Sequence, residues 1–192
     1  MGKIVVSSLV SLDGYTEGPG GDVMAIPMDM AFGNQNAERM AAASSLLFGA
    51  TTFRGMVSYW PHQVDNPDAG EDDRFIARRY ADGIPITVVS DSLTPEETEP
   101  YREQTTIVPR SGLAQRVAEL REQEGEALVF GSRTVWTELM AQGLVDVLYL
   151  MVGPKIVAGD HRVFEGVPET NAHLLDARRL PGSEIVLLTY GF

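Results

Sequence analysis

Three short apolar segments of the chain each end in a turn that is rich in small and hydroxyl residues. These turns are Gly49-Ala50-Thr51-Thr52, Ser90-Asp91-Ser92 and Gly131-Ser132-Arg133-Thr134. Glycine lets a ligand approach the backbone closely, and the free N–H groups at the start of a following helix suit a phosphate. Because the carboxyl ends of parallel strands share one edge of a sheet, we expect the three turns to lie together. Such an arrangement is typical of a dinucleotide-binding crevice.

The last of these turns belongs to the stretch from Glu126 to Gly159, around which the rest of the chain is organised. The run from Ala127 to Phe130 is apolar without alternation, which predicts a central strand covered on both faces. Ser132 or Thr134 is well placed to cap the helix that follows. An ordinary strand-to-helix turn that needed a small residue is the alternative interpretation.

The main candidate for a catalytic group is Asp29, near the start of a helix predicted from Pro27 to Ala43. Pro27 suits the first turn of a helix, and a carboxylate there interacts favourably with the helix dipole. A capping role is sufficient to explain Asp29 from the sequence alone. The alternative is a catalytic group.

Familiar catalytic and metal-binding motifs are absent from the chain. It contains no GxGxxG, no GxxxxGK[ST] and no GxSxG segment. The three histidines, His62, His161 and His173, lie far apart, and there is no cysteine to supply a thiolate. We therefore expect neither a metal site nor a disulfide.

The composition predicts one acidic globular domain over residues 1–192. A hydrophobic content of 44% is enough for one sizeable core, and no linker rich in Pro, Gly and Ser divides the chain. The formal net charge of −12 argues against a nucleic acid or an anionic membrane as a partner. The absence of cysteine fits a reducing compartment, and no segment resembles a signal peptide or a membrane span. We expect a cytoplasmic protein that binds a small molecule.

Short strands alternate with helical segments along most of the chain. Strands are predicted at 3–12, 45–49, 84–89, 105–108, 127–130 and 147–152, and helices at 27–43, 53–59, 75–81, 113–124 and between the Gly131 turn and Gly143. The tail is predicted to form two antiparallel strands, 173–180 and 184–192. The segment 95–103 is expected to be a solvated surface, and the loop 18–22 is either a lid or a mobile connection. This order predicts a mostly parallel sheet.

Taken together, these segments resemble the dihydrofolate-reductase-like superfamily, and within it the reductase domain of the bifunctional riboflavin-biosynthesis deaminase-reductase. The similarity covers nearly the whole chain. It is carried by Ser11–Tyr15 (SLDGY), Leu46–Phe53 (LLFGATTF), Val88–Ser90, Val129–Ser132 and Gly143–Asp146, with Pro154, Gly159 and Phe164. The resemblance implies an α/β three-layer fold, with a central mostly parallel sheet, helices on both faces and an antiparallel C-terminal hairpin. No deaminase zinc motif is present, so a reductase alone is expected.

The resemblance also implies NADPH as cofactor, with NADH as the alternative, and a small pterin-like or phosphoribosylamino-pyrimidine-like substrate. The segment from Pro27 to Phe32 is similar to the Pro-x-Asp-x-Ala segment that carries the substrate-binding acid, so Asp29 is the expected catalytic residue. Leu9, Asp13 and Phe32 are the expected substrate-binding residues. The expected cofactor-binding residues are Gly49, Ala50, Thr51, Thr52, Ser90, Gly131, Ser132, Arg133, Thr134 and Val135.

Two departures from the family pattern affect the expected cofactor. Many relatives carry arginine where this chain has Ala50 and Asp91, and both of those arginines lie near the adenosine phosphate. Their loss puts a preference for NADPH in doubt, and Arg54, Arg110 or Arg133 is then a substitute.

Two functions of different classes follow from these observations. The first is an NAD(P)H-dependent reductase of a small heteroaromatic substrate. The second is a nucleotide- or flavin-binding module of the same fold without reductase chemistry. A homodimer is also expected, from the resemblance and from the apolar run Val147 to Val152, which is predicted to lie near a sheet edge.

Overall fold

The computed structural model describes residues 1–192 and contains one eight-stranded sheet. The order of the strands across the sheet is β4-β3-β2-β5-β1-β6-β8-β7. Neighbours from β4 to β6 are parallel, whereas β8 is antiparallel to both β6 and β7. The expected mostly parallel sheet with an antiparallel C-terminal hairpin is confirmed. The strands are β1 (Lys3–Val10), β2 (Ala43–Gly49), β3 (Ile86–Val89), β4 (Thr105–Val108), β5 (Glu126–Phe130), β6 (Val147–Val152), β7 (His173–Arg179) and β8 (Val186–Gly191).

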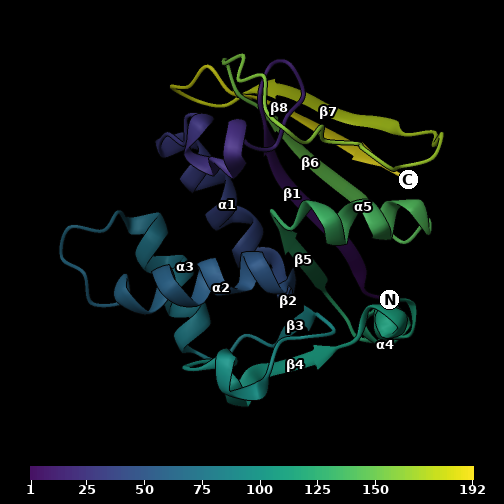
Figure 1. Ribbon diagram of the computed structural model, residues 1–192. Helices are drawn as coiled ribbons and strands as arrows, with labels where there is room; N and C mark the ends of the chain where they lie inside the picture. Colours follow the sequence, from purple (N-terminus) through teal and green to yellow (C-terminus); the bar gives the residue numbers. More distant parts are fainter.

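Helices cover both faces of this sheet, as expected for a three-layer fold. Figure 1 shows α1, α2 and α3 on one side of the strands, with α4 and α5 on the other. The helices are α1 (Met30–Ala42), α2 (Ala50–Tyr59), α3 (Glu71–Ala81), α4 (Leu113–Glu122) and α5 (Arg133–Ala141). Short 3₁₀ turns lie between them: η1 (Pro19–Gly21), η2 (Val23–Ala25), η3 (Trp60–His62), η4 (Pro95–Thr98), η5 (Arg102–Gln104) and η6 (Arg110–Gly112).

The two faces of the central strand β5 pack into two different cores. Ala127 and Val129 belong to the core beneath α4 and α5, whereas Leu128 and Phe130 belong to the core beneath α1 and α3. All four side chains are buried. Because successive side chains of a strand point to opposite faces, an unbroken apolar run is what a doubly covered strand requires. The prediction for this run is confirmed.

The start of α1 differs from the prediction. The helix begins at Met30, so Pro27 lies outside the first turn, and Asp29 is the N-cap residue with an extended backbone. The buried residues of the helix are Ala31, Gln35 and Met40. Met30, the first helical residue, is 79% exposed. The Asp29 side chain sets the start, because it accepts a hydrogen bond from the Phe32 N–H.

The acidic segment 95–103 is also more structured than expected. It contains η4 and the start of η5, and Thr98 and Tyr101 within it are buried. The Tyr101 ring packs against the Tyr80 ring, with a distance of 5.3 Å between centroids. Burial raises the pKa of Tyr101 to about 12. The remaining residues of the segment are exposed, so the prediction of a solvated surface holds except at Thr98 and Tyr101.

The position of β6 removes one argument for a dimer. β6 pairs with β1 on one side and β8 on the other, so its apolar run is sheet interior. The strand at that edge of the sheet is β7. The homodimer stays a prediction without support from this run. None of the helices combines the length and the apolar character that a bilayer crossing requires.

Candidate functional site

A cleft of about 570 Å³ crosses the carboxyl ends of the parallel strands. It follows the order of the sheet, from the turns after β3 and β4, past the starts of α2 and α5, to the loops after β1 and β6. The three turns singled out from the sequence therefore converge, as predicted. The lining residues are Glu17, Gly49, Ala50, Thr51, Thr52, Arg54, Val89, Ser90, Asp91, Ser92, Arg110, Ser132, Arg133, Thr134 and His161.

The helix starts at the middle of the cleft keep their backbone donors free. Gly49 is the N-cap residue of α2 and provides no side-chain cap, and Ser132 occupies the same position in α5. The prediction that Ser132 or Thr134 caps α5 is wrong, because the Ser132 hydroxyl accepts the Gly49 N–H at 3.1 Å instead. A side-chain cap would consume a donor of the first turn. Without one, the N–H groups at 50–52 and at 133–134 are available to an anion.

Backbone conformation brings the two turns close together. Gly131 and Ser132 both have positive φ values, 54° and 50°, in the left-handed region. This conformation suits Gly131 but costs Ser132 about 1–2 kcal/mol, and the hydrogen bond to Gly49 offsets part of that cost. A Cβ atom added at Gly131 would have the Thr52 Cγ2 atom as its nearest neighbour, at 3.7 Å. A larger side chain there would therefore stand in the gap between the turns.

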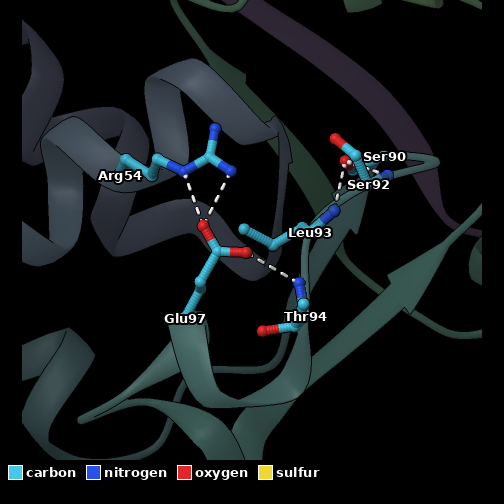
Figure 2. A network of polar contacts seen from close by, with 6 residues as sticks. All are labelled: Arg54, Ser90, Ser92, Leu93, Thr94 and Glu97. Atoms are coloured by element: carbon cyan, nitrogen blue, oxygen red, sulfur yellow. Dashed lines mark hydrogen bonds and ion pairs between the residues drawn. The ribbon is translucent and has the colours of Figure 1, made fainter.

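Three arginines line the cleft, and each has a carboxylate partner. The Arg54 guanidinium donates two hydrogen bonds to Glu97 Oε1, at 3.1 and 2.8 Å, as Figure 2 shows. Arg110 lies 3.8 Å from Asp91 and 3.6 Å from Glu138. Arg133 lies 4.0 Å from Glu165. All three substitutes that we considered for the missing family arginines are thus at the cleft.

The β3 end of the cleft is fixed by a second network in Figure 2. The Ser90 hydroxyl accepts the N–H groups of Ser92 and Leu93, at 3.2 and 3.0 Å. Glu97 accepts the Thr94 N–H at 2.9 Å through the oxygen that does not bind Arg54. The Thr94 N–H and then the Arg54 guanidinium lower the pKa of Glu97. Of the side chains in this network, Ser90 and Arg54 line the cleft, whereas Glu97 does not.

Most of the predicted cofactor-binding residues lie at this cleft. Gly131 does not line the cleft itself but lies next to Thr52 and Ser132, which do. Val135 does not reach the cleft. Val135 is 1% exposed and packs in the core behind Gly49. Those that line the cleft are Gly49, Ala50, Thr51, Thr52, Ser90, Ser132, Arg133 and Thr134.

Asp29 and Phe32 lie at the start of α1, Leu9 lies in β1, and none of the three lines the cleft. Asp29 Oδ1 accepts the Phe32 N–H at 3.1 Å, and Oδ2 accepts the Ser183 hydroxyl, which is 2.5 Å away in the turn between β7 and β8. Leu9 is buried in a small apolar cluster against which the half-buried Phe32 packs. The capping role of Asp29 is confirmed, and the carboxylate has a second partner that the sequence did not indicate.

Asp13 is separated from that group. Its carboxylate accepts the N–H groups of Val157 at 3.1 Å and Ala158 at 2.9 Å, and so joins the loop after β1 to the loop after β6. The Ser11 hydroxyl, followed by these two N–H groups, lowers the pKa of Asp13 to about 2. The observed contacts of this carboxylate are structural ones.

Glu17 and His161 line the cleft and were not identified from the sequence. His161 Nε2 lies 3.9 Å from Glu17, and His161 Nδ1 lies 3.5 Å from Glu165. Glu165 also lines a neighbouring cavity of about 480 Å³. Both missed residues follow strands whose carboxyl ends meet at the same edge, β1 and β6. The predicted order of strands would therefore have been enough to place Glu17 and His161 at the cleft.

The residues at the cleft favour an elongated anionic ligand. Backbone donors from two helix starts face its middle, with the hydroxyls of Thr51, Thr52 and Thr134 beside them. Polar side chains that can form hydrogen bonds line both ends of the cleft, Asp91 at one end and His161 at the other. This donor set is suited to the pyrophosphate of a dinucleotide with a nucleoside on either side.

Comparison with solved structures shows the fold. The chain aligns with a proposed riboflavin biosynthesis protein from Shewanella sp. PV-4 at 18% identity and a TM-score of 0.71, covering 98% of each chain. It aligns with dihydrofolate reductase from Enterococcus faecalis, solved with NADP(H), at 15% identity and a TM-score of 0.62, covering 98% of this chain and 95% of that one.

A third similar structure is larger than this chain. It is a diaminohydroxyphosphoribosylaminopyrimidine deaminase/5-amino-6-(5-phosphoribosylamino)uracil reductase from Thermotoga maritima, at 16% identity and a TM-score of 0.67. The alignment covers 98% of this chain and 56% of that one. A search of the curated proteins gives no match. The fold is thus dihydrofolate-reductase-like, and residues 2–186 match the model of the RibD C-terminal domain, the family to which this chain belongs.

Proposed function

We propose that the protein is a reductase that transfers a hydride from a nicotinamide dinucleotide to a small heteroaromatic substrate, of the pterin or phosphoribosylamino-pyrimidine class. The observation that carries the proposal is the pair of helix starts, α2 and α5, whose free N–H groups meet in one cleft. Membership of a reductase-like family supports the reaction type.

The cleft residues fit a dinucleotide in one extended arrangement. The N–H groups at 50–52 and 133–134 would hold the pyrophosphate, with Arg133 as a nearby cation. Gly131 provides the close backbone approach that this arrangement requires. The nicotinamide ring supplies a hydride when the dinucleotide is bound. The protein's own task is to place the two reacting rings in contact and to polarise the acceptor.

The residues around the start of α1 are suited to hold the acceptor ring. Leu9 and Phe32 offer an apolar wall beside a carboxylate, Asp29. A carboxylate accepts the N–H groups of an amino-substituted heteroaromatic ring and so favours the electron-poor form of that ring. The Ser183 hydroxyl, which donates to Asp29, would orient this carboxylate. We therefore propose Asp29 as the substrate-binding acid, with Ser183 as its positioning residue.

A second candidate is a nucleotide-binding module without reductase chemistry. One observation favours it: both oxygens of Asp29 already accept hydrogen bonds within the chain, from the Phe32 N–H and from Ser183. An acid whose partners are all internal can serve the fold alone. Both candidate functions require dinucleotide binding, but only the reductase oxidises the bound dinucleotide in turnover.

Dinucleotide titration followed by turnover tests this proposal. The purified chain is titrated with NADH and NADPH while nicotinamide fluorescence is followed. Cofactor oxidation is then measured with dihydropterins and with aminopyrimidines that carry or lack a ribosyl phosphate. Binding with oxidation by at least one acceptor supports the reductase. Binding without oxidation by any of them supports the module, and the absence of binding overturns both.

A further inference from the structure

We infer that the β3–β4 end of the cleft selects an unphosphorylated adenosine ribose, so that NADH is preferred over NADPH, and that Asp91 makes the selection. This inference rests on the proposed function, because it takes the ligand of the cleft to be a nicotinamide dinucleotide. It opposes the expectation of NADPH that the family resemblance gave.

The direction of the dinucleotide follows from the order of the strands. The cleft runs from β4 and β3, across β2 and β5, to β1 and β6. Leu9 lies in β1 opposite Met151 of β6, and both belong to the apolar cluster against which Phe32 packs. The nicotinamide has to reach the acceptor ring, so it lies toward β1 and β6. The adenosine half then lies at the turns after β3 and β4, where Asp91 and Arg110 line the cleft.

The carboxylate of Asp91 is held where an adenosine ribose would pass. Asp91 is the residue between Ser90 and Ser92, and the Ser90 hydroxyl fixes this turn by accepting the N–H groups of Ser92 and Leu93. The side chain of Asp91 is 59% exposed and lines the cleft. A carboxylate accepts hydrogen bonds from both hydroxyls of a ribose, whereas it repels a phosphate on the same sugar.

The cations at this end of the cleft are already engaged. The Arg54 guanidinium donates two hydrogen bonds to Glu97, whose other oxygen is fixed by the Thr94 N–H (Figure 2). The Arg110 guanidinium lies between two carboxylates, 3.8 Å from Asp91 and 3.6 Å from Glu138. Two guanidinium groups thus stand among three carboxylates. A phosphate dianion placed here would meet an excess of negative charge.

Arg110 is not free to neutralise a phosphate at this end of the cleft. Its backbone N–H donates to Asp91 Oδ1 at 3.0 Å, so the two residues are joined by the main chain as well as by their charges. If the guanidinium turned toward a phosphate, Asp91 and Glu138 would lose their cation while lying near the same dianion. The loss of the Asp91 charge is therefore the change that would free Arg110 to hold a phosphate.

The test compares dissociation constants of paired ligands for the purified chain at one fixed ionic strength. NADH is expected to bind about tenfold or more tightly than NADPH. ADP and its 2′-phosphorylated form are titrated in parallel, because they report on the adenosine half alone. Asp91→Asn keeps the size of the side chain and removes its charge, so NADPH should bind about tenfold more tightly to this variant than to the parent. Asp65→Asn, the same change in the exposed loop after η3, is the control and should leave both constants unchanged.

Each outcome decides the inference. The inference is supported if the parent binds NADH more tightly than NADPH, and ADP more tightly than its 2′-phosphorylated form, and if these differences in affinity become smaller in Asp91→Asn. Asp65→Asn should bind all four ligands as the parent does. Equal or tighter binding of NADPH by the parent overturns it and leaves the proposed function intact. A preference for NADH that survives in Asp91→Asn overturns the role of Asp91. If the parent binds neither dinucleotide, the proposed function fails and the inference fails with it.

Discussion

The two halves of the candidate site are built in different ways. The middle of the proposed dinucleotide half is made of backbone: the N–H groups that begin α2 and α5, in the Gly49 and Gly131 turns that the Ser132 hydroxyl joins. The substrate half is made of side chains that lie far apart in the sequence. The carboxylate of Asp29, for example, accepts the hydroxyl of Ser183 across 154 positions. Backbone geometry tolerates many sequences, whereas a side-chain site depends on each residue. We therefore expect substitutions in the second half to affect turnover and those in the first half to affect binding.

The largest expected effect is that of Asp29→Asn on turnover. Asparagine caps a helix as well as aspartate does, so α1 and dinucleotide affinity should be preserved. If Asp29 binds the acceptor ring, turnover falls by about 10²-fold or more, the scale of one acid–base contribution. Turnover is measured with whichever acceptor the screen identifies, and thermal unfolding confirms the fold. Turnover equal to that of the parent would leave Asp29 with a capping role only.

Ser183→Ala sharpens this result, because it removes the partner of Asp29 without touching the carboxylate. As a positioning residue, Ser183 should affect turnover less than Asp29 does, by about tenfold, with dinucleotide affinity unchanged. The pH profile of turnover separates this role from a purely structural one, since only a change at the acid would move it. An unchanged rate and an unchanged profile in Ser183→Ala contradict the positioning role.

The fold was predictable from the sequence to the extent that its determinants are local. The unbroken apolar run of β5 and the small-residue, hydroxyl-rich turns after β2, β3 and β5 predicted the sheet and the three turns that converge at its edge. The start of α1 was misplaced because Pro27 suits a first turn on its own, while the hydrogen bond between Asp29 and the Phe32 N–H sets the boundary. The contacts of Asp13 and Asp29 depend on the packing of distant loops, which no local pattern encodes.

Gly131→Val addresses the dinucleotide half. Valine at a φ of 54° is strained, and its side chain would project between the two turns, where Thr52 is the nearest neighbour. We expect dinucleotide affinity to fall by more than tenfold, with a smaller loss of stability of about 1–2 kcal/mol. Titration with NADH or NADPH measures the first effect and chemical unfolding measures the second. Gly14→Val is the control, because Gly14 also has a positive φ value and an open Cβ direction but lies outside the cleft. A folded Gly131→Val that binds as tightly as the parent contradicts the placement.

Asp13→Asn examines whether the carboxylate of Asp13, in the loop after β1, stabilises the fold or contacts the substrate. Because the folded chain holds the pKa of Asp13 at about 2, below its ordinary value of 3.8, ionised Asp13 stabilises the fold above pH 3.8. This contribution disappears as the pH falls from 3.8 toward 2. The variant should therefore be less stable than the parent at neutral pH, and the difference should vanish in acid. Amide hydrogen exchange at Val157 and Ala158 should also become faster, by about tenfold. Lost turnover with unchanged exchange at these two amides would instead point to a substrate contact.

The smallest expected effect concerns Ser132, whose hydroxyl joins the two turns at the middle of the cleft by accepting the Gly49 N–H. Ser132→Ala keeps the left-handed strain and removes the acceptor of the Gly49 N–H, so the free energy of unfolding should fall by about 1 kcal/mol. Ser132→Gly removes the same acceptor but also relieves the strain of about 1–2 kcal/mol, so its stability should equal or slightly exceed that of the parent. Chemical unfolding compares the three proteins under one condition. If alanine and glycine destabilise the chain equally, only the hydrogen bond from the Gly49 N–H to the Ser132 hydroxyl contributes to stability, and the backbone at Ser132 carries no strain. If glycine is the more stable variant and also binds a dinucleotide as the parent does, the geometry of the turn is a property of the main chain, as the comparison of the two halves predicts.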